Sequence, residues 1–281
     1  MDIRNIQFEL RQRRMDEVFD FALYVMRHNL WHYTSLLIGP VLLFGACNIA
    51  WSWYWYQLEE ELLFWSGPHF SLIALLFLQK SLIAHLLILY NGMFLFNEKP
   101  SRRSVWLGFW RSLLRYGWHQ IIVRMTWIFG LAWTLFFPAR SLVTHFFKSE
   151  VILLEQLKGR EMRERLRYLG RTHIERSIVF IAMELIFFIV WLLLGAFGYN
   201  QLVGLFDMQD FSWWTSANLE QGFLSPVVGL LCLPWFVFHS IAKFIYYIDA
   251  RAEREGWAIE IQLLRGLQND PLQGVDGASR I

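Results

Sequence analysis

Two charged residues stand inside stretches that are otherwise apolar, where a charge could take part in chemistry. Lys80 lies about eleven residues into the apolar run 69–96, which is roughly 16 Å from its start at the rise of a helix. A lysine near the centre of a bilayer costs at least about 2.5–3.5 kcal/mol and usually faces a protein interior that holds a partner. Glu184, in the run 177–203, is the natural partner. The pair predicts either a packing contact between helices or a proton or ion relay.

Other residues of reactive type are not spaced for catalysis or for metal binding. His28 and His32 could face one metal on a helix, but no third ligand lies near them in the sequence. His85 fits a hydrogen-bonded histidine of the interior, and Asp207 and Asp210 fit a solvated loop better than a cation site. The chain has no Gly-rich phosphate loop, no Gly-x-Ser-x-Gly and no His-Glu-x-x-His motif. We therefore expect no catalytic residue, no metal and no cofactor.

The composition excludes a soluble enzyme, a disordered chain and a disulfide-stapled domain. Of the 281 residues, 56% are hydrophobic and only 18% are charged, whereas soluble proteins average about 25% charged residues. Four apolar stretches reach the length of about 20 residues that a membrane-spanning helix needs. They lie at 33–56, 69–96, 177–203 and 222–248. These stretches predict an all-α polytopic membrane protein with about four transmembrane helices in a single membrane domain.

The distribution of positive charge predicts the orientation of these helices. Lys and Arg number five in residues 1–32, fifteen in 97–176 and five in 243–281. The connecting segments 57–68 and 204–221 contain none and carry acids instead. Because cytoplasmic segments are enriched in Lys and Arg, both termini and the segment 97–176 are predicted to be cytoplasmic.

The N-terminal segment 1–32 lacks the pattern of a cleaved signal peptide, so we expect it to be retained. Residues 15–31 have apolar side chains at helical spacing, which predicts an amphipathic helix resting on the membrane surface. That apolar face consists of Val18, Phe19, Ala22, Val25, Met26 and Leu30. The remaining parts are predicted to be a first transmembrane hairpin (33–96), a basic cytoplasmic segment (97–176), a second hairpin (177–248) and a cytoplasmic tail (249–281).

The apolar stretch 119–137 is a candidate for a fifth span, but a return crossing would have to use 138–155. That return segment contains Pro138, Arg140, His145, Lys148 and Glu150. We therefore prefer an interfacial or re-entrant helical insertion from the cytoplasmic side, whose backbone must be covered by protein. A six-span arrangement is the alternative.

Residues 158–176 predict a strongly basic helix. Its arginines could attract anionic lipid headgroups or dock an acidic protein partner, and nucleic acid is an unlikely ligand because the run abuts the membrane. The candidate docking residues are Arg160, Arg163, Arg165, Arg167 and Arg171.

A second polar cluster is expected where the fourth span ends. Arg251 and Glu255 are four residues apart and can pair on a helix, and Gly256 can end it. We interpret this region as a cytoplasmic electrostatic clasp that joins the chain end to the basic helix, with local capping as the alternative. The predicted clasp residues are Glu155, Asp249, Arg251, Arg254, Glu255, Gly256 and Glu260.

Three ordered motifs carry a resemblance to a known family. They are Leu78 and Lys80 followed by Phe96 and Glu98; Leu154, Glu155, Leu157, Lys158 and Gly159; and Tyr247, Asp249, Arg251, Arg254, Glu255, Gly256 and Glu260. In this order and spacing the chain resembles a family of uncharacterised bacterial multi-pass inner-membrane proteins. Ser81, Asn97 and Ala258 replace the family's Pro, Gly and Asp, as in a divergent member.

The resemblance implies partners and a location, but no activity. Family members are usually encoded beside a MoxR-type AAA+ ATPase, a von Willebrand-type protein, a protein like sporulation stage II protein M and a transglutaminase-like membrane protein. We therefore expect a non-enzymatic subunit or scaffold of a cell-envelope complex in the bacterial inner membrane. A transporter or channel for a small solute or lipid, using Lys80 and Glu184, is the alternative.

Overall fold

The described part of the chain is helical throughout, as the sequence predicts. A computed structural model describes residues 13–57, 67–95, 100–133, 146–172, 174–206 and 226–255, and no strand occurs among them. The long helices are α2 (Leu30–Gln57), α3 (Gly67–Leu95), α4 (Arg102–Trp133), α8 (Ile174–Phe206) and α10 (Pro226–Glu255). The shorter elements are α1 (Met15–His28), α6 (Lys148–Glu150), the π-helix η2 (Val151–Glu155) and α7 (Gly159–Thr172).

Four of these helices are long and apolar enough to cross a membrane, so the prediction of a four-span, multi-pass membrane protein is confirmed for the described ranges. The apolar segments are Leu30–Tyr54, Ala74–Leu95, Ile174–Gly195 and Val228–Glu255. Although α4 has 32 residues, it contributes no such segment, because His119, Gln120 and Arg124 interrupt its apolar run.

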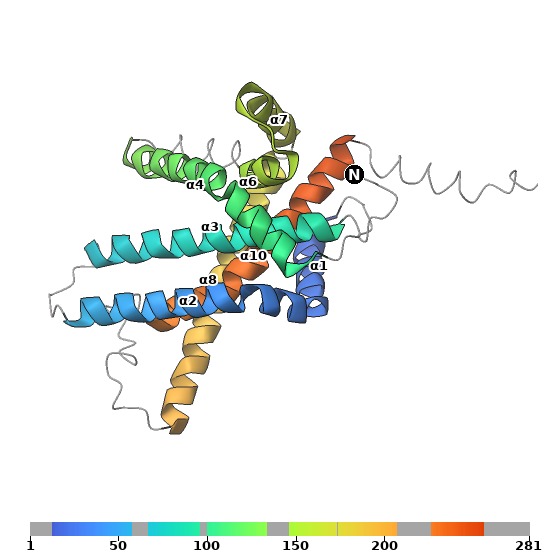
Figure 1. Cartoon of the computed structure of the whole chain (residues 1–281). Coiled ribbons are helices and arrows are strands. Elements are labelled where there is room, and N and C mark those ends of the chain that lie inside the picture. Colours follow the sequence, from blue (N-terminus) through green and yellow to red (C-terminus); the bar gives the residue numbers. More distant parts are fainter. Residues whose placement is uncertain are drawn as a thin grey trace, which may run out of the picture.

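Helix α10 lies at the centre of the molecule and packs against α1, α2, α3, α7 and α8. Helices α2 and α3 run alongside each other, whereas α8 crosses them steeply and its C-terminal half extends beyond them (Figure 1). Many apolar side chains of α8 are exposed, including Leu185, Ile186 and Ile189. Such a surface suits contact with lipid chains.

The amphipathic N-terminal helix is present, and its apolar face is covered by protein rather than by lipid. Its apolar residues Val18, Phe19, Ala22 and Val25 are buried by protein, chiefly against α10. The Phe19 ring stacks on Phe180 of α8 at 5.1 Å. A protein interior and a lipid interior are equally apolar, so the pattern of the helix could not distinguish between them.

Hydrogen bonds between polar side chains hold α2 to α3. Asn48 and Gln79 exchange two amide hydrogen bonds, of 2.7 and 3.3 Å, and both side chains are buried. Nearer the other end of the pair, Tyr33 donates to Asn91 Oδ1 at 2.7 Å. These bonds satisfy polar groups that would be costly to leave unpaired in an apolar surrounding, and they fix how far one helix can slide along the other.

The segment that follows residue 145 is a buried plug rather than a further span. Phe147, Val151 and Ile152 are buried, and η2 packs against α3, α4 and α7. After η2 the backbone turns at Gln156, whose φ is +54°, and Arg115 of α4 donates to the Gln156 and Leu157 carbonyls at 2.7 Å. Residues 146–155 are thus covered by protein, as the predicted insertion requires; residues 134–145 lie outside the described part.

Gly229 should be essential for the packing of α10 against α2. A Cβ at Gly229 would lie 2.6 Å from Asn48 Nδ2 and 3.0 Å from Asn48 Cβ, so Gly229→Ala should displace Asn48 and lower the melting temperature in detergent. The control is Gly198→Ala on α8, where a Cβ meets nothing within 4 Å. Helix propensity alone should make that control neutral or slightly stabilising, by up to about 1 kcal/mol. Equal melting temperatures for the two variants would contradict the close approach.

Candidate functional site

Three spanning helices bring ionisable side chains together in the middle of their lengths. Lys80 of α3 donates from Nζ to Glu184 Oε1 of α8 at 3.3 Å. His239 of α10 places Nδ1 2.5 Å from the same oxygen. The two residues that the sequence suggests as partners therefore lie within ion-pair distance, and His239 is a third member. We call Lys80, Glu184 and His239 the intramembrane triad.

The triad is partly shielded rather than sealed. The side chains of Lys80, Glu184 and His239 are 30%, 16% and 10% exposed. In surroundings this apolar, a carboxylate with two cationic or hydrogen-bonding neighbours is far less costly than a lone charge. An amine, an imidazole and a carboxylate in contact can also exchange a proton without bulk water.

A second buried ion pair lies one helical turn further along α10. Lys243 donates to Ser149 Oγ at 2.8 Å and its Nζ lies 3.1 Å from Glu150 Oε1. Glu150, at the end of α6, has no exposed surface. The ion pair attaches the plug to α10. The position of Glu150 in the sequence did not predict this contact.

His85 occupies a separate polar site between α3 and α4. Its Nε2 lies 2.7 Å from Ser112 Oγ, and its ring packs against Phe109 and Tyr116 at centroid distances of 4.6 and 4.5 Å. The expectation of a hydrogen-bonded interior histidine is therefore met, and these contacts give His85 a structural role.

At the end of the bundle that holds α7, charged side chains from three elements form the clasp. Arg165 of α7 donates from Nε to Glu155 at 2.7 Å and from Nη2 to Glu255. Tyr247 donates to Glu155 Oε1 at 2.5 Å, and Arg251 donates to Glu255 at 2.8 Å. Hence η2, α7 and the last turns of α10 are joined by Glu155, Arg165, Tyr247, Arg251 and Glu255, and we keep the name clasp for these five residues.

Burial and charge act in opposite directions on the pKa of Arg165. Burial favours the neutral guanidine, but the hydrogen bonds and charges of Glu155 and Glu255 outweigh it and raise the pKa above its ordinary value. The guanidinium therefore stays charged at any physiological pH. The ion pair between Arg165 and Glu255 can therefore hold α7 against α10 over this whole pH range.

Other residues predicted for the clasp have different surroundings. Asp249 faces away from it and forms a buried ion pair with Arg13, at 2.6 Å, so it ties the start of α1 to α10 instead. Arg254 accepts a hydrogen bond at its backbone oxygen from Tyr168 and lies over that ring, 5.1 Å from its centroid. Gly256 and Glu260 lie outside the described residues.

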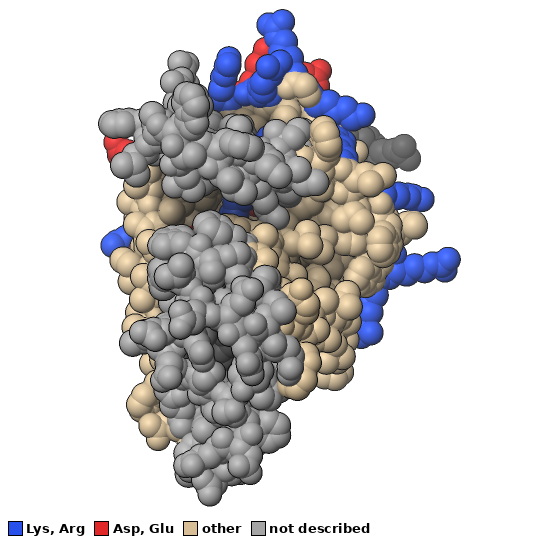
Figure 2. Space-filling view, turned by 90° about the vertical axis from the view of Figure 1, so that its left-hand side faces the viewer, with Lys and Arg blue, Asp and Glu red and all other residues tan. Residues whose placement is uncertain are grey.

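The predicted docking arginines fall into two groups. Arg160, Arg163 and Arg167 are exposed on α7, whereas Arg165 is turned inward into the clasp and differs from the expectation of a docking residue. The reason is the helical period, since Arg165 shares the face of α7 that buries Met162, Leu166 and Leu169. The side chain of Arg171 lies outside the described set. Figure 2 shows Lys and Arg gathered at the end of the molecule where α7 lies and further ones projecting from the right-hand edge.

The geometry shows no assembled metal site. Among the residues described, no three His, Cys, Asp or Glu side chains gather closely enough to hold a metal ion. Asp207 and Asp210, the acids of the predicted loop, lie outside the described ranges.

Comparison of the chain with models of protein families, with curated proteins and with solved structures finds no match. The family resemblance carried by the motifs around Lys80, Glu155 and Tyr247 therefore stays a prediction.

Removing one member of the intramembrane triad should destabilise the protein, and removing two should restore part of the loss. Glu184→Gln leaves Lys80 without a counter-charge, at a cost of about 3 kcal/mol, the lower end for a buried pair. Lys80→Met should cost less, because Glu184 keeps His239. Thermal unfolding of the detergent-purified variants measures this. If the losses of the two single variants simply add in Lys80→Met/Glu184→Gln, the two side chains do not interact.

The clasp should stabilise the protein more than the exposed arginines of α7 do. Arg165→Gln removes the charged hydrogen bonds from α7 to Glu155 and Glu255, and bonds of this kind contribute about 1.5–3 kcal/mol. Arg163→Gln makes the same substitution at an exposed position and should change the melting temperature little. Limited proteolysis of the same samples should release α7 faster in Arg165→Gln only. Indistinguishable variants would mean that α7 is held by its apolar face alone.

Proposed function

We propose that this chain is a non-enzymatic membrane subunit or scaffold of a multi-protein cell-envelope complex in the bacterial inner membrane, and that it docks its partners through the basic face of α7. The observation that carries the proposal is the attachment of α7. Its inner face is fixed by the clasp and by Met162, Leu166 and Leu169, while Arg160, Arg163 and Arg167 point outward. A surface helix held this firmly offers a preorganised binding face.

Preorganisation matters because ordering a flexible segment on binding costs free energy. The exposed arginines of α7 lose little when a partner arrives, since the helix is already in place. Arg160 pairs with Glu164 at 2.7 Å, but both side chains are largely exposed, and such a pair contributes only about 0–1 kcal/mol. An acidic partner surface can therefore replace it.

The elements on this side of the molecule support the proposed cytoplasmic orientation. Arg13 beside α1 pairs with Asp249, and Arg165 of α7 pairs with Glu255, so the start of α1, α7 and the end of α10 lie at one end of the bundle. These are also the regions richest in Lys and Arg, which face the cytoplasm under the positive-inside rule. The proposed partners include the MoxR-type ATPase and its companions, which only the family resemblance suggests.

Transport of a small solute or lipid is the second candidate, and the intramembrane triad favours it. Ionisable residues at mid-span commonly mark ion or proton pathways. The ion pair between Lys80 and Glu184 fits a purely structural contact between helices equally well. The subunit role and the transport role therefore need separate measurements.

The docking proposal is tested by purifying the tagged protein from native membranes in mild detergent. Wild-type protein should retain partners in fixed proportion. Arg160→Glu/Arg163→Glu/Arg167→Glu should lose them, while its own melting temperature stays close to that of the wild type. The matched control is Arg102→Glu/Arg103→Glu/Arg111→Glu, which reverses three exposed arginines on α4.

Equal loss of partners in both triple variants would contradict a specific role for α7. A wild-type protein that purifies alone would contradict the subunit proposal. In that case flux of ions or protons into liposomes, with Lys80→Met as the comparison, tests the second candidate, and flux unaffected by that substitution would reject it.

A further inference from the structure

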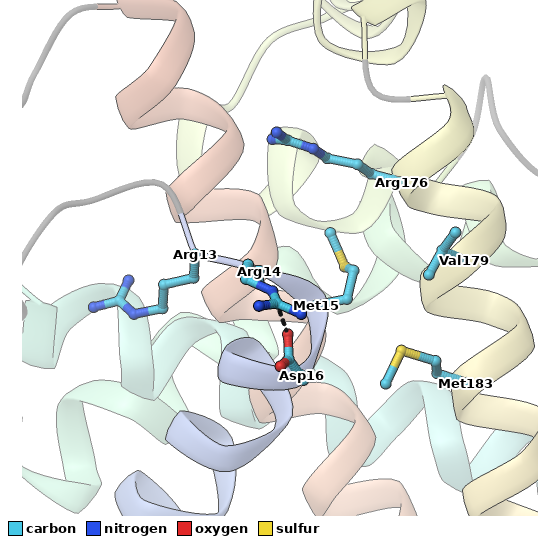
Figure 3. A pocket seen from close by; sticks show the side chains of 7 residues that line it. All are labelled: Arg13, Arg14, Met15, Asp16, Arg176, Val179 and Met183. Atoms are coloured by element: carbon cyan, nitrogen blue, oxygen red, sulfur yellow. Dashed lines mark ion pairs between the residues drawn. The ribbon is translucent and has the colours of Figure 1, made fainter.

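A cleft opens between the beginning of α1 and the first turns of α8. It is a largely open hollow of about 620 Å³, within the range of roughly 300–1,000 Å³ that proteins use for small molecules. Arg13, Arg14, Met15, Asp16, Arg176, Val179 and Met183 line it. Figure 3 shows Arg176 reaching over the cleft from α8, with Val179 and Met183 below it on the same helix, whereas Arg13 points away.

The rim of the cleft suits an anion. Arg14 and Arg176 approach it from two different helices. Arg176 donates from Nη1 to Glu253 at 2.8 Å, but a guanidinium has five N–H donors, more than this contact uses. The first turn of α1 also lines the cleft, and its N-cap residue, Arg14, makes no side-chain capping bond. First-turn amides and the positive end of the helix dipole favour a negative group there.

The acid at the rim does not block this site. Asp16 pairs with Arg14 at 3.4 Å, but the two side chains are 56% and 80% exposed. An exposed pair of this kind contributes only about 0–1 kcal/mol, so a phosphate can take the place of the carboxylate. Arg13 contributes little charge to the cleft because Asp249 neutralises it.

Below the rim the cleft becomes apolar in the direction of the membrane. Arg176 lies two residues into the apolar segment Ile174–Gly195. Val179 and Met183 follow it by three and seven residues on one face, which places them about 4.5 and 10.5 Å deeper along the helix. Met15 faces them from α1. A charged rim above an apolar floor matches a phospholipid, which has a charged headgroup and apolar acyl chains.

We propose that this cleft binds one anionic phospholipid, with the headgroup phosphate between Arg14 and Arg176 and an acyl chain along Val179 and Met183. The site is separate from the docking face of α7 and does not depend on the proposed function. The lipid would join the beginning of α1 to the first turns of α8.

The test is native mass spectrometry of the full-length, detergent-purified protein with added dioleoylphosphatidylglycerol. Wild-type protein should retain one tightly bound lipid. Arg14→Gln/Arg176→Gln should weaken its retention by at least about tenfold. Arg160→Gln/Arg163→Gln removes the same charge from α7 and should leave retention within about twofold. Equal weakening in both variants would show only general attraction of lipid to positive charge, and would overturn the proposal.

Further probes separate the parts of the lipid. Dioleoylglycerol, which lacks the phosphate, should bind far more weakly; equal binding would overturn the role of the arginines. Inorganic phosphate in large excess should not displace the lipid; full displacement would show that the site takes a soluble anion. Val179→Trp should fill the apolar floor and weaken lipid retention without changing the charge of the site. Unaltered retention would show that the acyl chain does not bind along Val179.

Because Arg14→Gln/Arg176→Gln also removes the Arg176–Glu253 contact, the single variant Arg14→Gln is measured beside it. Arg14 is largely exposed, so this variant should keep the wild-type melting temperature and still bind the lipid several-fold more weakly. Unchanged retention in this folded variant would overturn the assignment of Arg14.

Discussion

An ionisable group in an apolar interior needs a partner, and α10 carries a succession of such groups on a helix surrounded by protein. Each contacts a different element. His239 reaches Glu184 on α8, Lys243 reaches Glu150 before η2, and Asp249 reaches Arg13 before α1. At its end, Glu255 reaches Arg165 on α7. The angular position and depth of α10 are therefore fixed from several sides, and the elements around it are fixed by α10 in turn.

Much of this architecture follows from the sequence, because apolar length and charge distribution report directly on the membrane. The four spans and the proximity of Lys80 and Glu184 could be inferred in this way. The sequence does not reveal the contacts of His239 and Lys243 or the Arg13–Asp249 pair. The periodicity of apolar residues shows which face of a helix is buried, but it does not show which neighbouring helix that face contacts. Arg13 and Asp249 are 236 residues apart. One feature of the sequence could have identified His239: it is an ionisable residue within an apolar run, and such residues are rare and usually have a partner.

The molecule has two polar centres with different surroundings, connected by α10. His239 and Arg251 are twelve residues apart, or about 18 Å along the helix, so a rotation of α10 would alter the intramembrane triad and the clasp together. Around this axis, α8 presents an apolar surface and α7 a basic one. Such a division suits a protein that is anchored in lipid on one side and contacts charged surfaces at one end.

The position of α10 in the chain has a consequence for biosynthesis. Every partner named above precedes α10, so Glu150 emerges from the ribosome before Lys243, the residue that pairs with it. Until α10 is inserted, Glu150 lacks Lys243, and the earlier helices lack the helix that they pack against in the final arrangement. The translocon or a chaperone would have to retain the incomplete chain during this interval. A chain that ends before α10 would leave Glu150 without Lys243, a feature by which proteolytic quality control could detect it.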